Sequence, residues 1–298
     1  MPTKKQKRLF LFAAFDRDNV VDDTLTYYVR ELSKLGDVVF VMDNELNENE
    51  IKKISKIPNV LYAFATKHNE YDFGSYKRGF LWAKDKDILK KYDWLYFVND
   101  SVYGPLYNIN SELQNLENSG CDFVGMTSNC DDNTPFHVQS WFAGFSKKIF
   151  SSKFFNDFMN KITHDSNKTS IVMKYEVGLS CAIMRHGFRA HVLLDRPNYS
   201  IYEKPRTALA MGLPFVKKNG ISNLRRMYFL YPHIEHEELL GYIAAHMKRH
   251  NVKMVKDSFR DTYNLRFFGI PLVRISSKRS KYYKVYLFKH IPILKIEK

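Results

Sequence analysis

The sequence predicts an α/β fold in which a mostly parallel sheet is covered by helices on both faces. Two observations support this prediction. Short apolar runs alternate with longer amphipathic segments through the first 130 residues. The apolar runs are unbroken by polar residues, which is typical of strands that are buried on both faces. The chain therefore favours a Rossmann-type arrangement, with strands and crossover helices in turn.

The expected elements follow one another along the chain. Strands are expected at residues 8–15, 37–44, 59–66, 93–100, 121–129 and 189–195. Helices are expected at residues 21–36, 48–57, 74–92 and 174–188, with shorter ones around 223–230 and 236–250. Acids in the first turn and Gly36 near the end favour the first helix, and Pro58 ends the second. The segment "HVQSWFAGFSKKIF", residues 137–150, leads into a further helix.

Charge separates the chain into two parts. Residues 1–203 hold 26 Lys and Arg against 26 Asp and Glu, whereas residues 204–298 hold 20 against 6, so the last third bears the whole net charge of +14. We expect one α/β domain over residues 1–203 and a basic extension of helices and hairpins over residues 204–298. In that extension "IPLVRI" recurs as "IPILKI", which predicts two small hairpin strands or interfacial segments. Such asymmetry indicates a negatively charged partner, either nucleic acid or anionic lipid.

The location of the protein is predicted from its cysteines and its apolar runs. The cysteines, Cys121, Cys130 and Cys181, are few and scattered, which suits a reducing compartment. The amino terminus imitates a signal peptide, but the apolar run ends early, at Asp16, so a buried strand is the better interpretation. No stretch approaches the roughly 20 apolar residues of a membrane span. We therefore expect a cytoplasmic protein.

Polar residues follow several of the expected strands. Ligands of parallel sheets bind outside the carboxyl ends of the strands, and those ends carry Asp16, Asp43, the loop 66–74 and Asn99-Asp100-Ser101. Asp100 could coordinate Mg²⁺ or Mn²⁺, which would then bridge phosphates. The same three residues fit a simple turn or a helix cap equally well. A dinucleotide site is disfavoured because no glycine-rich fingerprint is present.

The stretch "YDFGSYKRGF", residues 71–80, combines aromatic and basic side chains at the start of a helix. Lys77 and Arg78 could bind phosphate by charge and through free backbone N–H groups. Tyr71, Phe73 or Tyr76 could stack on a nucleobase or a sugar. The alternative is a surface helix whose aromatic residues pack on the core.

Further candidates lie in the second half of the α/β domain. Glu176 could act as a general base, although an acid at a helix amino terminus is also favoured by the helix dipole alone. His137, Gln139 and Trp141 alternate and should share one strand face. Gln139 could then bond sugar hydroxyls and Trp141 could stack on a sugar, unless Trp141 is a core residue.

Four motifs together resemble the rhamnan synthesis protein F family of bacterial polysaccharide glycosyltransferases. They are "YDFGSYKRG", "FVNDSVYGP", "HVQSWFAGFSKKIF" and "YEVGLSCAIMRHGF", and the resemblance covers roughly residues 8–200. It implies a GT-A-like fold, with Asn99-Asp100-Ser101 in place of the Asp-X-Asp metal motif. Since the paired acids of that motif are missing, the resemblance leaves strict metal dependence open.

The resemblance also implies roles for the candidate residues. Asp16, Asn99, Ser101 and the loop 69–79, with Tyr71, Asp72, Phe73, Tyr76, Lys77 and Arg78, would bind a dTDP-, UDP- or GDP-linked sugar. Glu176 would be the base of an inverting transfer of rhamnose or another hexose. His137, Gln139 and Trp141 would contact the acceptor, which would be a lipid-linked or cell-surface polysaccharide or lipopolysaccharide precursor.

The basic extension would hold such an enzyme at the inner face of the cytoplasmic membrane, as a peripheral protein. The alternative is a non-enzymatic nucleic-acid-binding protein that uses the same basic residues. Nucleic acid is the less expected partner, because no RRM-type motif or zinc finger is evident.

Overall fold

The computed structural model describes most of the chain as two compact units, Met1–Lys253 and Met254–Lys298. The described residues are 6–131, 134–165, 167–195 and 201–255, with the backbone of four later strands at 261–267, 270–277, 282–287 and 291–297. The first unit continues past residue 203, where the sequence places the end of the α/β domain. Within the described residues, no helix combines the length and apolar character needed to cross a bilayer.

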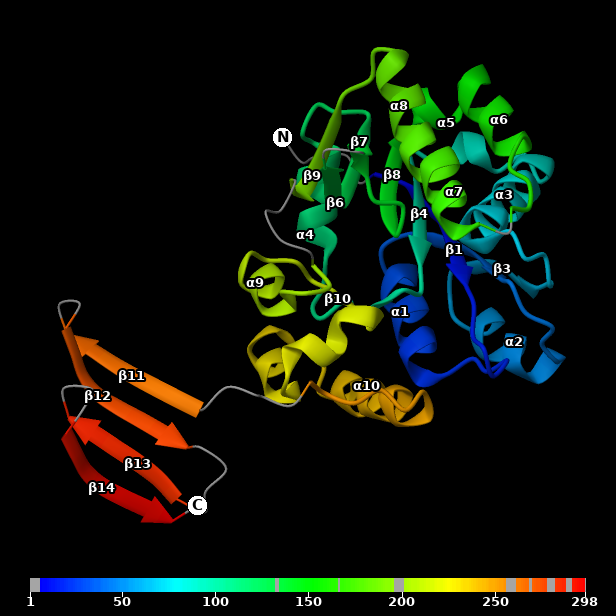
Figure 1. The fold of residues 1–298 in the computed structure, drawn as a ribbon. Helices are drawn as coiled ribbons and strands as arrows, with labels where there is room; N and C mark the ends of the chain where they lie inside the picture. Colours follow the sequence, from blue (N-terminus) through cyan, green and yellow to red (C-terminus); the bar gives the residue numbers. More distant parts are fainter. Residues whose placement is uncertain are drawn as a thin grey trace. The chain divides into compact units, whose positions relative to one another are not determined.

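The first unit is built on one mixed sheet of eight strands (Figure 1). Its strands run in the order β3-β2-β1-β4-β8-β6-β7, and β9 pairs with β6. They are β1 (Arg8–Ala14), β2 (Asp37–Met42), β3 (Val60–Ala65), β4 (Trp94–Asn99), β6 (Phe123–Asp131), β7 (Thr134–Val138), β8 (Phe142–Ser146) and β9 (Ala190–Leu194). The first four strands in space are parallel, whereas β8 is antiparallel to both β4 and β6. The predicted α/β class is confirmed, with a mostly parallel sheet.

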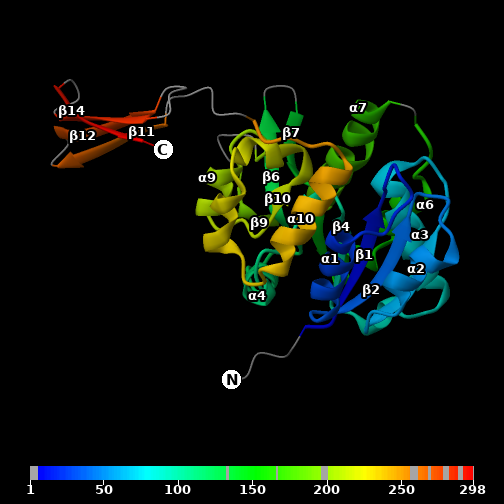
Figure 2. The ribbon, with the colours of Figure 1, turned by 90° about the horizontal axis from the view of Figure 1, so that it is seen from below.

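Helices cover both faces of this sheet (Figure 2). They are α1 (Asp23–Ser33), α2 (Glu48–Ser55), α3 (Tyr71–Asp85), α4 (Asn110–Glu117), α5 (Lys147–Phe150), α6 (Lys153–Asn160), α7 (Lys168–Ile171), α8 (Gly178–Arg185), α9 (Pro205–Ala210) and α10 (Glu238–Arg249). A π-helical turn, η2 (Val172–Val177), joins α7 to α8, and 3₁₀ turns form η1 (Leu89–Lys91), η3 (Lys218–Leu224) and η4 (Met227–His233). The expected elements are present, but residues 137–150 form the end of β7, then β8 and α5.

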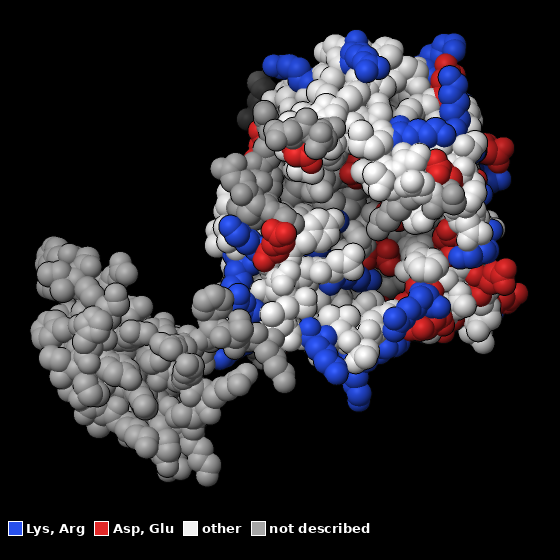
Figure 3. Space-filling view, viewed as in Figure 1, with Lys and Arg blue, Asp and Glu red and all other residues white. Residues whose placement is uncertain are grey.

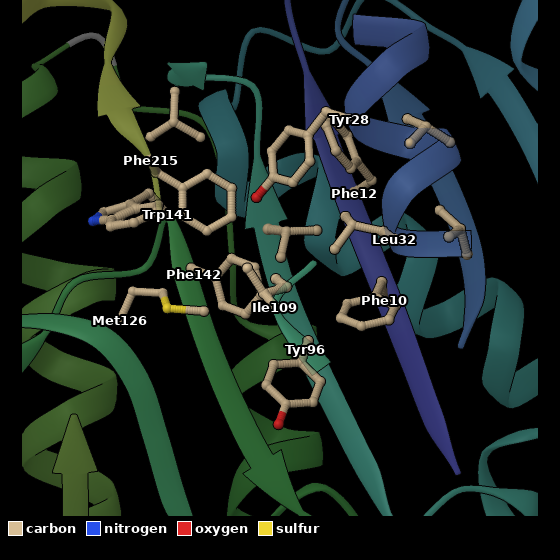
Figure 4. Packing of buried hydrophobic residues seen from close by; sticks show 14 of the residues in the cluster. Phe10, Phe12, Tyr28, Leu32, Tyr96, Ile109, Met126, Trp141, Phe142 and Phe215 are labelled. Atoms are coloured by element: carbon tan, nitrogen blue, oxygen red, sulfur yellow. The ribbon is translucent and has the colours of Figure 1, made fainter. Parts of the chain in front are cut away.

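Strand β1 shows why the sheet is covered on both sides. Phe10 and Phe12 point into one apolar cluster, where residues of α1 and α4 contribute, and Leu9 and Leu11 point into a second cluster under α3, α6 and α8. Successive side chains of a strand face opposite sides, so an unbroken apolar run fills both clusters at once. Figure 4 shows the first cluster, where Phe12 packs edge-on against Tyr28 and Trp141 packs edge-on against Phe215.

The second unit is a four-stranded antiparallel sheet in the order β11-β12-β13-β14. Its strands are β11 (Asp261–Phe267), β12 (Ile270–Ser277), β13 (Tyr282–Leu287) and β14 (Ile291–Glu297). Each hairpin has a register shift next to the proline of its Ile-Pro pair, where Pro271 lies opposite Arg266 and Pro292 lies opposite Tyr286. Proline cannot donate to a strand ladder, so both repeats interrupt the ladder in the same way. The two repeats form β12 and β14, so the prediction that they are hairpin strands is confirmed.

Candidate active site

The carboxyl ends of β1 and β4 meet at one edge of the sheet. Ala13 of β1 lies opposite Asn99 of β4, and the Asp100 backbone N–H donates to the Ala13 carbonyl at 3.2 Å. Asp16 follows β1 directly and is buried. Acidic and basic side chains lie together in a hollow on this side of the molecule, below α7 and above α10 (Figure 3). The edge chosen from the sequence therefore does gather Asp16, Asn99, Asp100 and Ser101.

Asn99 is the centre of a chain of hydrogen bonds across this edge. Its side-chain amide donates to Asp72 Oδ2 of α3 at 2.7 Å, and its Oδ1 accepts from the Ser101 hydroxyl at 2.5 Å. Ser101 Oγ in turn accepts from Lys217 Nζ at 2.9 Å. Lys217 belongs to β10 (Val216–Lys217), which pairs with β5 (Val102–Tyr103) just after Ser101. This series of hydrogen bonds thus links α3 to β10 through the tip of β4.

Asp72 has an unusual acidity for a carboxyl group. Burial raises its pKa to about 7, and the negative charges of Asp100 and Glu176 act in the same direction. The Lys217 ammonium and the hydrogen bond from Asn99 act against them. The protonation of Asp72 therefore depends on the charges of both Asp100 and Glu176. A carboxyl group of this kind can gain or lose a proton near neutral pH.

Asp100 has an ammonium group as its counter-charge. Burial raises its pKa, and the nearby Lys218 opposes that shift. Lys218 Nζ lies 3.6 Å from Asp100 Oδ2. Mg²⁺ and Mn²⁺ need several oxygen ligands, whereas this carboxylate stands beside a fixed positive charge. The residues at Asp100 therefore do not fit the divalent cation that the sequence suggests there.

Glu176 lies inside a helix, not at its amino terminus. It belongs to the π-helical turn η2, which continues α7 into α8, so the helix-dipole explanation does not apply. Its Oε2 accepts from the backbone N–H of Ser140 at 2.6 Å and from the Ser140 hydroxyl at 2.5 Å. His137 Nε2 lies 3.5 Å from its Oε1. Such π turns are frequent at functional sites, and this one fixes the Glu176 carboxylate.

The three expected acceptor residues do not share a strand face, because β7 ends at Val138. His137 is buried and lies beside Glu176. Gln139 Oε1 accepts from the Thr127 hydroxyl at 2.6 Å. Trp141 is buried in the core, and its indole N–H donates to Thr127 Oγ1 at 2.9 Å. Contact of these residues with an acceptor stays a prediction.

The stretch 71–80 forms the first turns of α3, which begins three residues earlier than expected. Phe73 and Tyr76 are buried, and Tyr76 stacks on Phe97 with ring centroids 4.3 Å apart. Tyr71 is 42% exposed. The two residues that the sequence suggests as phosphate ligands make hydrogen bonds within the protein. Lys77 donates to the Ile162 carbonyl at 2.7 Å, and Arg78 donates to Glu70 at 2.6 Å. Tyr71 is thus the aromatic residue of this stretch that reaches the surface.

Sequence reasoning missed the residues that α10 brings to Asp16. Arg249 donates to both carboxylate oxygens of Asp16, at 2.8 and 2.7 Å, and also to Asp22 at 2.9 Å. Burial raises the pKa of Asp16, but the bonds from Arg249 and from backbone N–H groups bring it below its usual value. His246 Nδ1 donates to Asp22 Oδ2 at 2.6 Å. The signal available was the spacing of His246, Arg249 and His250 on one helix face.

One group of ligand atoms in the described residues could hold a metal ion. Oxygen atoms of Asp16 and Asp18 and a ring nitrogen of His250 lie within 4.8 Å of one another. However, Arg249 donates to both of these aspartates. A cation could therefore bind there only after the guanidinium group has moved away.

Comparison with known proteins gives one family match and several distant relatives. The family model described as rhamnan synthesis protein F matches residues 38–273. The uncharacterized protein y4gN of Sinorhizobium fredii is 28% identical over 159 residues, which cover 53% of this chain and 40% of that protein. The virulence protein VirA of Vibrio anguillarum is 24% identical over 193 residues, which cover 64% of this chain and 60% of that protein. This chain thus spans 40% to 60% of these curated relatives.

Solved structures give a looser likeness. A cytidylyltransferase from Leptospira borgpetersenii is 13% identical, with a TM-score of 0.43 over 85% of this chain and 99% of that chain. A glycosyltransferase involved in the glycosylation of the major capsid of PBCV-1 is 11% identical, with a TM-score of 0.36 over 70% of this chain and 94% of that chain.

Proposed function

This chain belongs to the rhamnan synthesis protein F family, and from that premise we propose that it is a glycosyltransferase that moves a sugar from a nucleotide-sugar to a glycan. The sugar would be rhamnose or another hexose, and the donor would be dTDP-, UDP- or GDP-linked. The acceptor would be a lipid-linked or cell-surface polysaccharide or lipopolysaccharide precursor. The GT-A-like α/β fold, with a mostly parallel mixed sheet, suits a nucleotide site at the carboxyl ends of its strands.

The observation that supports this proposal most directly is the hydrogen-bonded group of Asp72, Asn99, Ser101 and Lys217, at the edge where ligands of such sheets bind. The charges of Asp100 and Glu176 help to raise the pKa of Asp72, and the Lys217 ammonium lowers it. Structural carboxylates are usually paired or solvated. A half-buried acid with a pKa near 7 among other acids, such as Asp72, is instead typical of a functional site.

For the donor we propose a site beside β1 and β4. Asp16 lies at the end of β1, where a ribose hydroxyl could take the place of one Arg249 contact. The exposed ring of Tyr71 could stack on the nucleobase, while Asn99 and Ser101 face the sugar-diphosphate end. Phe73 and Tyr76 would support Tyr71 from the core, and Lys77 and Arg78 would hold the helix that presents it.

For the transfer we propose that Glu176 is the general base. The acceptor hydroxyl would pass its proton to Glu176 while its oxygen bonds to the anomeric carbon of the donor. The bond from that carbon to the diphosphate breaks, and the nucleoside diphosphate leaves with the electron pair. Attack opposite to the leaving group inverts the anomeric configuration. The Ser140 contacts hold the carboxylate for this purpose, and no step needs Mg²⁺ or Mn²⁺ at Asp100.

We further propose that residues 204–298 attach the protein to an anionic membrane surface, at the inner face of the cytoplasmic membrane. Residues 254–298 alone hold 11 Lys and Arg against 3 Asp and Glu. Basic residues near an anionic leaflet contribute about 1 kcal/mol each. A lipid-linked acceptor would be found at that same surface.

A thermal-shift screen with UDP-, dTDP-, GDP- and CMP-linked sugars tests the proposed function. We expect one nucleotide class to raise the melting temperature, and product analysis with that donor should then show transfer. If no nucleotide-sugar stabilises the protein while RNA or DNA binds tightly and in a salt-sensitive way, the glycosyltransferase proposal is wrong. The nucleic-acid-binding alternative would then take its place.

A further inference from the structure

Two consecutive lysines, Lys217 and Lys218, reach the tip of β4 from a distant part of the sequence. Lys217 lies opposite Val102 in the β10–β5 ladder, and the Lys218 backbone N–H donates to the Ser101 carbonyl at 2.9 Å. Their backbones are therefore fixed against the two residues that follow Asp100. Backbone hydrogen bonds set the position of both lysines, so this position does not depend on side-chain conformation.

The side chains of both lysines reach the tip of β4, where Lys217 contacts Ser101 and Lys218 contacts Asp100. Lys217 is 4% exposed; its Nζ donates to Ser101 Oγ at 2.9 Å and lies 4.5 Å from the Trp141 ring centroid. Lys218 Nζ lies 3.6 Å from Asp100 Oδ2. Lys217 is buried and Lys218 is half-buried, and the fold brings both ammonium groups to one strand end.

The other cations near this edge have other hydrogen-bond partners. Arg249 is bound to Asp16 and Asp22, Lys77 to the Ile162 carbonyl, and Arg78 to Glu70 and the Gly74 carbonyl. Among the described residues, Lys217 contacts Ser101 and Lys218 contacts Asp100 through their ammonium groups. A ligand with two or more negative charges at this strand end would therefore lie beside these two ammonium groups.

We propose that Lys217 and Lys218 bind the diphosphate of the donor, with the Lys218 ammonium in the place that a divalent cation would take at Asp100. This inference rests on the proposed function and names the diphosphate subsite of the same site. Hydrogen bonds from an ammonium group to phosphate oxygens are charge-assisted on both sides, which makes them stronger than those between neutral groups. The two charges would also stabilise the negative charge that the leaving diphosphate gains. Asp100 is then a positioning residue for Lys218.

Binding of inorganic pyrophosphate in the presence of EDTA tests this inference on the full chain. We expect calorimetry to show binding without metal, and Lys218→Met and Lys217→Met each to raise the Kd about 10- to 100-fold, as charge-assisted hydrogen bonds imply. Lys218→Arg should retain most of the affinity. Lys84→Met, in which an exposed lysine of α3 loses its bond to Asn156, is the matched control and should bind pyrophosphate normally.

Three results would overturn the inference. The first is pyrophosphate binding that is absent in EDTA and appears only when Mn²⁺ is added. The second is unchanged affinity in Lys218→Met, which is partly exposed and serves as the decisive variant if Lys217→Met fails to fold. The third is a loss of affinity in Lys77→Met or Arg78→Met that matches or exceeds the loss in Lys218→Met.

The two proposals can fail separately. If nucleotide-sugars stabilise the protein but the Lys217 and Lys218 variants bind pyrophosphate normally, this inference is wrong and the proposed function stands. If both lysines carry pyrophosphate binding but no sugar is transferred from any donor, the diphosphate subsite stands and the proposed function is wrong.

Discussion

Replacing Asp72 by asparagine should stabilise the protein at alkaline pH. The substitution keeps the shape of the side chain, and the amide oxygen can still accept the hydrogen bond from Asn99. The substitution removes the ability of this side chain to ionise. Any change in the pH dependence of stability is therefore due to that ionisation.

The sign and the size follow from the pKa of Asp72. Its pKa is about 7 in the folded protein, against a reference value of 3.8. Because the folded-state pKa is raised, the associated stability is fully present below about pH 4 and is lost as the pH rises through 7. The difference of roughly three units corresponds to about 4 kcal/mol, which is an upper limit for the gain in Asp72→Asn at pH 8.

Urea denaturation at pH 4.5 and pH 8, followed by tryptophan fluorescence, measures this effect. The free energy of unfolding of Asp72→Asn should exceed that of the wild type by about 2–4 kcal/mol at pH 8 and by no more than about 1 kcal/mol at pH 4.5. Asp85→Asn is the control, since Asp85 is an exposed acid in the last turn of the same helix, paired with Lys86 at 3.4 Å. Equal differences between Asp72→Asn and the wild type at the two pH values would refute the reasoning.

Two further predictions concern the proposed chemistry and its location. Glu176→Gln should lower turnover by about 10²–10⁴-fold with little change in donor affinity, measured by steady-state kinetics; near-normal turnover, or a product with retained anomeric configuration, would contradict the assigned role. Replacing Lys278, Arg279, Lys281 and Lys284 together by glutamine should reduce co-flotation with anionic vesicles by at least about tenfold, given roughly 1 kcal/mol per basic residue. Equal flotation of the wild type with neutral and anionic vesicles would exclude the charge-based attachment.

The sequence predicted the sheet edge because that edge depends on local patterns. Runs such as "RLFLFAAF" and "DWLYFVND" fill both faces of a sheet, so they identify β1 and β4 and the polar residues that follow them. The burial of Phe73 and Tyr76 was also within reach: with Phe80 and Ala83 they fall at helical spacing on one face of α3. Reading Tyr71–Gly74 as a loop hid that periodicity.

The cations of the site were beyond local reasoning. Lys217 and Ser101 are 116 positions apart in the sequence, and Arg249 and Asp16 are 233 positions apart. Nothing near Lys217 in the sequence distinguishes it from the other basic residues of the last third. Lys77 and Arg78 were chosen because they lie close to the motif in sequence, whereas the fold uses them to hold α3 in place. Only the ladder between β5 and β10 reveals which lysines reach β4.

The chain of hydrogen bonds from Asp72 through Asn99 and Ser101 to Lys217 has an evolutionary consequence. Its four members come from three segments of the chain, yet each contact depends on the partner's donor or acceptor character. A substitution at Asn99 would leave the Asp72 carboxyl without a donor and the Ser101 hydroxyl without an acceptor, so a single change would be selected against. Across relatives, these four positions should therefore vary together or not at all, as one inherited unit.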